Sequence, residues 1–327
     1  MIRIFILLTL LLQFGCASHN AVKVSRQAGI EPKVLLQLPA TIAGETARTG
    51  AGSKQWQSEE WNAKGSALLQ LSPEMRRYLR STAKDGSAVE RMNAVLRDMR
   101  ARGFYLQYDL NRTTSAAEAF ALQQGNCVSH AAMIVAMARY LGLEAYVNQG
   151  AINVNSQLAE SQSGVRFRQN ISHINAVLLT GDGAYIIEQD NKIYPGKNLH
   201  LLDDRKAKSL YLNNLAMEAM FRDELEQAFV YMRNAIALDD DSSALWVGLG
   251  TIHRRMGFPL LAQQSFTHAL NLNGEDAVAQ HNLALLQESM QVEETYADNF
   301  SSSDNLNGRA NLAAISTDGL EIQLLAR

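Results

Sequence analysis

The chain has 327 residues, of which 47% are hydrophobic, and its formal net charge at pH 7 is −3. This length is enough for two folded domains. The slight negative charge and the lack of a basic stripe argue against nucleic acid as a partner. The high hydrophobic content and only five prolines favour a globular, helix-rich protein. With two cysteines in the whole chain, no disulfide framework is predicted.

The N-terminal segment has the pattern of a secretion signal. Arg3 supplies one positive charge, and a mostly apolar run from Ile4 to Leu12 follows it. A helix of these nine residues would cover about 14 Å, too short for a bilayer core of about 30 Å. The run therefore predicts a signal peptide over residues 1–15 rather than a membrane-spanning helix.

Gly15-Cys16 resembles the processing site of bacterial lipoproteins, in which the cysteine receives a lipid after cleavage. The resemblance implies lipidation of Cys16 and anchoring in the bacterial cell envelope, facing the periplasm. Ala17-Ser18 include no aspartate, and by resemblance to enterobacterial lipoproteins this permits the outer membrane. The alternative is ordinary secretion, in which Cys16 is lost or unused. Residues 16–66, which follow, predict a tether with some local order.

The second cysteine lies where two helices are expected to meet. Ser115 and Glu118 have the spacing of a capping box, which predicts a short helix through residue 122. Gly125 is expected to end that helix in a left-handed conformation. Asn126 can cap the next helix, so that Cys127 becomes its first residue.

The helix that begins at Cys127 is predicted to pack on one face and to end at Gly142. Apolar residues recur along it at helical spacing. The positive end of a packed helix favours the thiolate over the thiol, and the thiolate is the nucleophile. Cys127 is therefore a candidate nucleophile, although a free cysteine can also be a small buried hydrophobe. The presence of a nearby base would favour the nucleophile over the buried hydrophobe.

Two predicted strands supply that base. Residues 173–179 indicate a strand that His173 opens, residues 180–183 a turn, and residues 184–190 the return strand. Because side chains alternate along a strand, Glu188 and Asp190 are expected to share one face. In a hairpin the end of the second strand lies beside the start of the first, so either acid can orient His173. A nucleophile, a base and an orienting acid suffice for acyl transfer through a covalent intermediate.

The pattern resembles a known family. Gly125-Asn126-Cys127 before an Ala-rich helix, then His173 on a strand and an acid on the next, is similar to the bacterial transglutaminase-like domain, which has a papain-like fold. The resemblance implies that Cys127 is the nucleophile and His173 the base. The family's spacing from the aromatic residue of the second strand implies Glu188 as the third member, whereas its usual residue type favours Asp190, towards which we lean. The domain is expected to cover residues 67–205.

A second hydrogen-bond donor is needed for the oxyanion, besides the backbone N–H of Cys127. Gln124 and Gln123 are the candidates, because papain-like enzymes often use an upstream glutamine. His130 lies one helical turn after Cys127 and could approach the thiol. We expect it instead to face solvent or to be satisfied in the core.

An internal repeat follows this domain. Three pairs of leucine and a small residue recur at a spacing of 34 residues, namely Leu215-Ala216, Leu249-Gly250 and Leu283-Ala284. The pattern resembles the tetratricopeptide repeat, in which small residues let two helices approach and large ones fill the groove opposite. It implies an all-α domain of about two and a half repeats over residues 206–292. So few repeats are expected to stack on the preceding domain. His253 is expected to pack in the core of the repeats. The polar tail, residues 293–327, is expected to be mobile.

The predicted fold is thus an α+β papain-like, transglutaminase-like domain followed by an all-α tetratricopeptide-repeat domain. The leading functional hypothesis is an envelope-tethered cysteine enzyme, a peptidase, amidase or transglutaminase-like protein, that acts on peptide or carboxamide bonds through a thioester. Hydrolysis is favoured over transfer because water outnumbers amines in the periplasm. The alternative is a non-catalytic scaffold or adaptor lipoprotein that binds protein partners.

The partners expected from the sequence are a protein or peptide substrate, recruited by the repeats, and a membrane reached through a lipid on Cys16. No cofactor and no metal are expected, because the chain carries no HExxH, no pair of CxxC motifs and no His/Asp cluster.

Overall fold

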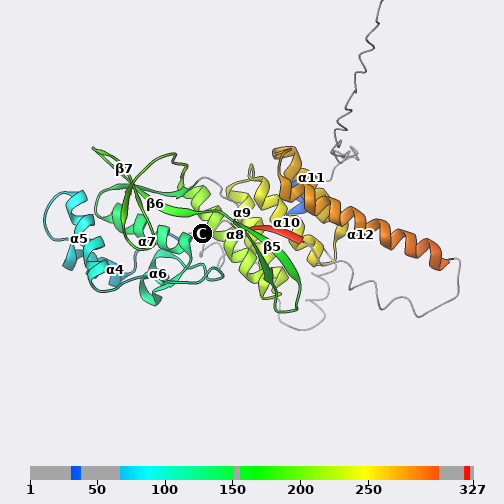
Figure 1. Cartoon of the computed structure of the whole chain (residues 1–327), viewed down its shortest axis with the longest axis horizontal. Coiled ribbons are helices and arrows are strands. Elements are labelled where there is room, and N and C mark those ends of the chain that lie inside the picture. Colours follow the sequence, from blue (N-terminus) through cyan, green and yellow to red (C-terminus); the bar gives the residue numbers. More distant parts are fainter. Residues whose placement is uncertain (1–30, 38–66, 151–154, 302–319, 325–327) are drawn as a thin grey trace, which may run out of the picture.

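The computed structural model describes residues 31–37, 67–150, 155–301 and 320–324 (Figure 1). The expected signal peptide and Cys16 lie outside the described residues, as does most of the expected tether. Within the tether the structure describes one short helix, α1 (Pro32–Leu35), whose Leu35 is buried. This helix contacts α11 of the C-terminal helical region.

Four helices form one side of the first domain: α4 (Pro73–Thr82), α5 (Ala88–Ala101), α6 (Ala116–Leu122) and α7 (Cys127–Tyr140). Serine side chains cap the first three, and Asn126 caps α7. The expectation of a single buried face on α7 is wrong, because every residue from Cys127 to Ala138 is buried. Other elements cover this helix on all sides, so it forms the centre of the domain.

A five-stranded sheet packs against α7. Its order is β8-β7-β6-β3-β9, and all of its pairs are antiparallel. The strands are β3 (Glu144–Gln149), β6 (Ile174–Thr180), β7 (Gly183–Ile187), β8 (Ile193–Pro195) and β9 (Leu201–Leu202). Helix α7 contacts the central strand, β6, and its neighbour β3. The expected hairpin is confirmed as β6 and β7, although β7 ends at Ile187, before the two acids.

Two smaller sheets complete the strand content of the described residues. A two-stranded parallel sheet joins β1 (Gln107–Tyr108) to β2 (Gln124–Gly125), directly before α7. A three-stranded sheet has the order β10-β5-β4, with β4 (Asn155–Glu160), β5 (Arg166–Ile171) and β10 (Leu320–Leu324). The hairpin of β4 and β5 lies between β3 and β6 in the sequence, and β5 leads directly to His173.

The C-terminal region consists of helices that pack against their neighbours in sequence (Figure 1). They are α8 (Asp204–Phe221), α9 (Leu225–Leu238), α10 (Ser243–Arg255), α11 (Pro259–Leu272) and α12 (Ala277–Ser301). Small residues mark the close approaches: a Cβ on Gly250 would lie 2.5 Å from Cε1 of Phe266. His253 is fully buried, as expected for a core residue. The assignment of these helices to the tetratricopeptide family stays a prediction.

The helical region contacts the first domain through side chains as well as backbone. Arg139 of α7 forms an ion pair of 2.8 Å with Asp204 at the start of α8. The turn of the β4–β5 hairpin contacts the end of α8, where the backbone N–H of Ser163 donates to Oδ2 of Asp223 at 2.7 Å. The two parts are therefore joined by polar contacts at both ends of α8.

The C-terminal tail differs from the irregular segment expected from residue 293 onwards. Helix α12 continues to Ser301, and β10 pairs in parallel with β5 and contacts α10 and α12. Strand β10 could not be predicted, because strands that pair across such a long sequence separation, here Leu320 with Phe167, leave no local signal. Among the described residues, no helix combines the length and the apolar character that a membrane span needs.

Candidate active site

The start of α7 is built by local capping, much as the sequence predicts. The capping box of Ser115 and Glu118 is complete, and Asn126 accepts the backbone N–H of Ser129 at 3.2 Å, which leaves Cys127 as the first helical residue. One detail is corrected: the left-handed residue that ends α6 is Gln123, with φ of 51°, and not Gly125.

Gly125 is needed for a different reason. A Cβ at this position would lie 2.7 Å from Oγ of Ser129 and 2.9 Å from Oγ1 of Thr114, and its φ of +154° lies where side chains are rarely found. The glycine therefore allows the loop of residues 113–114 to pack directly against the first turn of α7.

Cys127 is fully buried at the junction of α7 and β6. The backbone N–H of Ile174, the residue after His173, donates to its sulfur. Burial raises the pKa of the Cys127 thiol to about 12, although the backbone N–H groups of Ile174, Val128 and Cys127 lower it. The expectation that the helix start favours a thiolate is therefore wrong for this resting structure, because desolvation outweighs the helix dipole.

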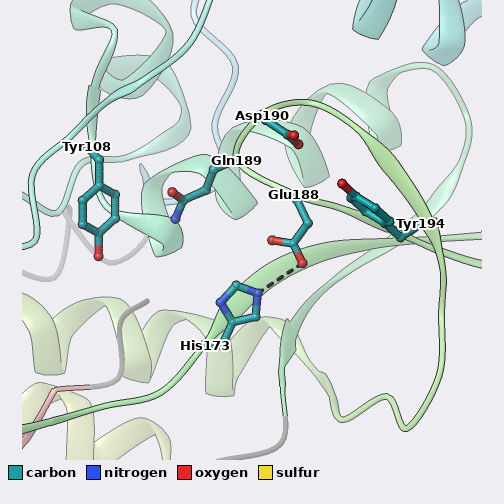
Figure 2. A pocket seen from close by; sticks show the side chains of 6 residues that line it. All are labelled: Tyr108, His173, Glu188, Gln189, Asp190 and Tyr194. Carbon is teal, nitrogen blue, oxygen red and sulfur yellow. Dashed lines mark hydrogen bonds and ion pairs between the residues drawn. The ribbon is translucent and has the colours of Figure 1, made fainter. Parts of the chain in front are cut away.

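His173 lies directly before β6 and is paired with a carboxylate (Figure 2). Its Nε2 atom is 3.1 Å from Oε1 of Glu188. A carboxylate only accepts, so the neutral imidazole carries its proton on Nε2 and keeps its basic lone pair on Nδ1. Burial alone would raise the pKa of Glu188, but the hydrogen bond and charge of His173, together with the amide of Asn175, hold it below the usual value.

Asp190, the acid favoured by residue type, contacts Lys192, whereas Glu188 contacts His173. The Asp190 carboxylate forms an ion pair of 2.7 Å with Lys192 and accepts the backbone N–H of the same residue at 3.0 Å. The physical reason is a turn: β7 ends at Ile187, and the backbone N–H of Glu188 donates to the carbonyl of Lys192. Beyond Glu188 the chain no longer alternates as a strand, so the two acids do not share a face.

Asparagines that sequence reasoning did not assign hold Glu188 in place. Asn175 donates from Nδ2 to Oε1 of Glu188 at 3.0 Å, and its own Oδ1 accepts from Asn148 at 2.9 Å. Asn148 in turn accepts the backbone N–H of His200 at 2.7 Å. Asn148 and Asn175 are both buried. The antiparallel register, which sets these two residues opposite each other, is what sequence reading could have used to find them.

A pocket of about 690 Å³ opens beside this pair. It is lined by Tyr108, His173, Glu188, Gln189, Asp190 and Tyr194 (Figure 2). The two tyrosines stand on either side of it, on β1 and β8. The His173 side chain is 44% exposed, whereas Cys127 is 0% exposed, so the base reaches the pocket and the thiol does not.

One known family matches part of the chain. Residues 75–185 match the model of the transglutaminase-like superfamily. This segment of the chain is a transglutaminase-like domain. No curated protein and no solved structure matches the chain. The match begins within α4 and ends within β7, so it includes Cys127 and His173 but not Glu188. At a coarse level it supports cysteine-dependent acyl transfer or hydrolysis by the transglutaminase-like domain.

The two glutamines proposed for the oxyanion hole of the transglutaminase-like domain lie before Cys127 but differ in environment. Gln123 is exposed, and Gln124 is half-buried, with its amide donating to Oε1 of Gln107 at 3.3 Å. Their role in binding an oxyanion stays a prediction.

His130 forms a hydrogen bond in the core of the transglutaminase-like domain. Of the two expectations, exposure to solvent or burial with a partner, the second is confirmed. It is buried, and its Nε2 lies 3.0 Å from Oδ1 of Asn191, whose Nδ2 donates to the carbonyl of Phe104 at 3.0 Å. Burial lowers the pKa of His130, against the hydrogen bond of Asn191 and the charges of Glu188 and Asp190. A neutral His130 thus joins α7 to the loop after Glu188. Within the described ranges no group of three His, Cys, Asp or Glu residues could hold a metal ion.

Proposed function

We propose that this chain is an envelope-tethered cysteine enzyme that cleaves peptide or carboxamide bonds through a thioester on Cys127. The observation that carries the proposal is the hydrogen bond of 3.1 Å between His173 and Glu188. It lies at the start of β6, where the backbone N–H of Ile174 contacts the Cys127 sulfur. The contact between helix α7 and strand β6, which are distant in sequence, supports the pairing that we propose between the thiol and the imidazole.

In the first step the sulfur of Cys127 attacks the carbonyl carbon while Nδ1 of His173 takes the thiol proton. Because burial keeps the thiol protonated, His173 acts as a general base during attack, in the manner of a serine–histidine pair, rather than on a preformed thiolate. Glu188 stabilises the imidazolium that forms. Collapse of the tetrahedral intermediate passes the proton to the leaving amine and leaves a thioester, which water then hydrolyses.

Burial of the thiol adds a requirement to this sequence of steps. Since Cys127 is 0% exposed, a substrate carbonyl reaches the sulfur only after a movement uncovers it. The pocket is lined by the exposed side chain of His173, so a substrate that occupies it lies beside the base. We expect binding in the pocket and opening over Cys127 to be coupled.

Mass spectrometry of the purified protein after exposure to cell-envelope extract tests the reaction. The proposal predicts an acyl adduct on Cys127 that hydroxylamine removes, as it does any thioester. The adduct is absent in Cys127→Ala and greatly reduced in His173→Ala. An adduct of equal yield in His173→Ala, or none in the parent protein, would contradict the proposal.

Membrane tethering is a separate part of the proposal and rests on the sequence around Cys16. The substitution Cys16→Ser should move the protein from the membrane pellet to the soluble fraction. Retention of this variant in the pellet would remove lipid attachment at Cys16 from the account, without affecting the chemistry proposed for Cys127.

A non-catalytic scaffold is the second candidate function, and two observations favour it. The thiol is buried and its pKa is raised, as in a structural cysteine. In addition, β10 contacts α10 and α12, so this helical surface accepts an extended segment. A protein that acts only as a scaffold would form no adduct at Cys127 with any acyl donor, but would retain extended peptides on its helical region.

A further inference from the structure

Glu218 is a buried carboxyl group of the helical region that reaches into the transglutaminase-like domain. It lies on α8, is 7% exposed, and its Oε1 accepts the backbone N–H of Thr113 at 2.6 Å. The two residues are 105 positions apart in the chain. This contact is made to the loop directly before α6, and not to a helix surface.

The contact continues to the helix that carries the nucleophile of the proposed function. Oγ1 of Thr113 accepts from Nδ2 of Asn126 at 2.7 Å, and Oδ1 of Asn126 accepts the backbone N–H of Ser129 at 3.2 Å. Asn126 is the N-cap of α7, and Cys127 is its first residue. Three consecutive hydrogen bonds therefore connect α8 to the first turn of α7.

A second set of bonds prevents the loop from moving independently of that turn. The backbone N–H of Thr114 donates to Oγ of Ser129 at 2.7 Å, and Oγ1 of Thr114 donates to the carbonyl of Gln124 at 3.2 Å. At Gly125 there is no room for a side chain, because Ser129 and Thr114 pack directly against its Cα. A shift of residues 113–114 must therefore shift the start of α7, because both sides of the loop are bonded to it.

The environment of Glu218 favours the neutral carboxyl group, which can still accept the hydrogen bond from Thr113. Burial raises its pKa to about 8, while the hydrogen bonds of Thr113 and the charge of Arg222 lower it and the charge of Asp109 raises it. Tyr211, on the same helix, also interacts with it electrostatically. A glutamine at this position keeps an oxygen that can accept the hydrogen bond from Thr113. It should therefore perform the same structural role as the protonated acid.

We propose that Glu218 is a positioning residue through which the helical region fixes the first turn of α7 and keeps Cys127 covered. The inference rests on the proposed role of Cys127 as nucleophile, because only then does the position of this turn control chemistry. A ligand that moves α8 would act on Cys127 through Thr113 and Asn126, which gives the helical region a route to regulate the thiol.

Alkylation of Cys127 by iodoacetamide, followed by peptide mass spectrometry across a pH series, tests the inference in the full chain. Glu218→Leu removes the acceptor, so the first turn of α7 should loosen and the thiol should meet water. We expect its alkylation at pH 7 to be about tenfold faster and the rise of rate with pH to begin lower, since desolvation is what raises the thiol pKa. Glu218→Gln should stay within about twofold of the parent protein.

Two further variants keep the test decisive. Thr113→Val removes the next acceptor in the series and should reproduce the effect of Glu218→Leu even if the latter folds poorly. Glu226→Leu, which removes a half-buried carboxylate from α9, is the matched control and should leave the pH profile unchanged. If Glu218→Leu and Thr113→Val both fold and show the parent pH profile, the inference is wrong.

Alkylation needs no turnover, so this inference and the proposed function fail separately. An unchanged pH profile together with acyl-adduct formation would remove the positioning role of Glu218 and leave the enzyme. A changed profile in a protein that forms no adduct would retain the connection from α8 through Thr113 to α7 and remove the catalytic role of Cys127.

Discussion

Nε2 of His173 lies 3.1 Å from Oε1 of Glu188, and this pairing selects one of two acids that the sequence left open. The third side chain in the arrangement, Asn175, donates to the same oxygen at 3.0 Å. Glu188 is therefore held by two donors, whereas Asp190, which also lines the pocket, is paired with Lys192.

Substitution of the two acids should accordingly have unequal effects. Glu188→Gln removes the charge that stabilises the imidazolium, so we expect acylation of Cys127 by p-nitrophenyl acetate to slow by about 10²-fold. Asp190→Asn should change that rate by less than about threefold, because an exposed ion pair contributes little. The initial burst of p-nitrophenolate measures both. A larger loss in Asp190→Asn than in Glu188→Gln would reverse the assignment.

The reactivity of Cys127 should depend on pH as expected of a buried thiol. Because the pKa lies near 12, the rate of alkylation in the absence of substrate should rise about tenfold per pH unit from pH 7 to pH 10 without a plateau. Folding also keeps the proton on the sulfur while the unfolded thiol ionises near pH 9, so stability should fall as the pH rises above 9. Cys127→Ser should lose that part of the pH dependence. A plateau in alkylation below pH 9 would show that the thiolate is stabilised.

Asn191 has a left-handed backbone conformation and a side chain that forms two hydrogen bonds. Two substitutions separate the contributions of the backbone and of the side chain to stability. Its φ is 57°, and its amide bonds both His130 and the carbonyl of Phe104. Asn191→Gly keeps the backbone conformation and should destabilise the fold by about 2 kcal/mol through the lost hydrogen bonds. Asn191→Ala should cost about 1 kcal/mol more, because a Cβ strains this conformation. Urea unfolding checks the difference, and equal stability of the two variants would disprove the strain.

Gly250 tests the packing of α10 on α11. A Cβ at this position would lie 2.5 Å from Cε1 of Phe266, so Gly250→Ala should destabilise the fold by about 1–3 kcal/mol. Adding Phe266→Leu should recover part of that loss, which a double-mutant cycle measures by chemical denaturation. Gly274→Ala is the control, because its nearest neighbour would be 3.7 Å away. Additive effects of Gly250→Ala and Phe266→Leu would contradict the contact.

The sequence predicts features that depend on residues close together in the chain better than features that depend on residues far apart. The cap of α7 by Asn126 and the capping box of Ser115 depend on residues three positions apart, and both are confirmed. The hairpin of β6 and β7 is also local. By contrast, the turn after Glu188 depends on the left-handed backbone conformation of Asn191, which no sequence pattern predicts. The contact of Glu218 with Thr113 joins positions 105 residues apart.

The protonation state of Cys127 could not be predicted for a related reason. A helix start favours the thiolate by a local effect, which the sequence reveals. Desolvation depends on everything that packs around α7, including β3 and β6 from later in the chain. In the folded protein the second effect is larger, so the thiol stays protonated.

The central claim is that the sulfur of Cys127 and the imidazole of His173 work as one pair. The most direct measurement is the p-nitrophenolate burst of the parent protein, of Cys127→Ala and of His173→Ala under the same conditions. The account predicts a burst of one equivalent per chain, its loss in Cys127→Ala and a rate at least about 10²-fold lower in His173→Ala. An undiminished burst rate in His173→Ala would show that the pair does not act together.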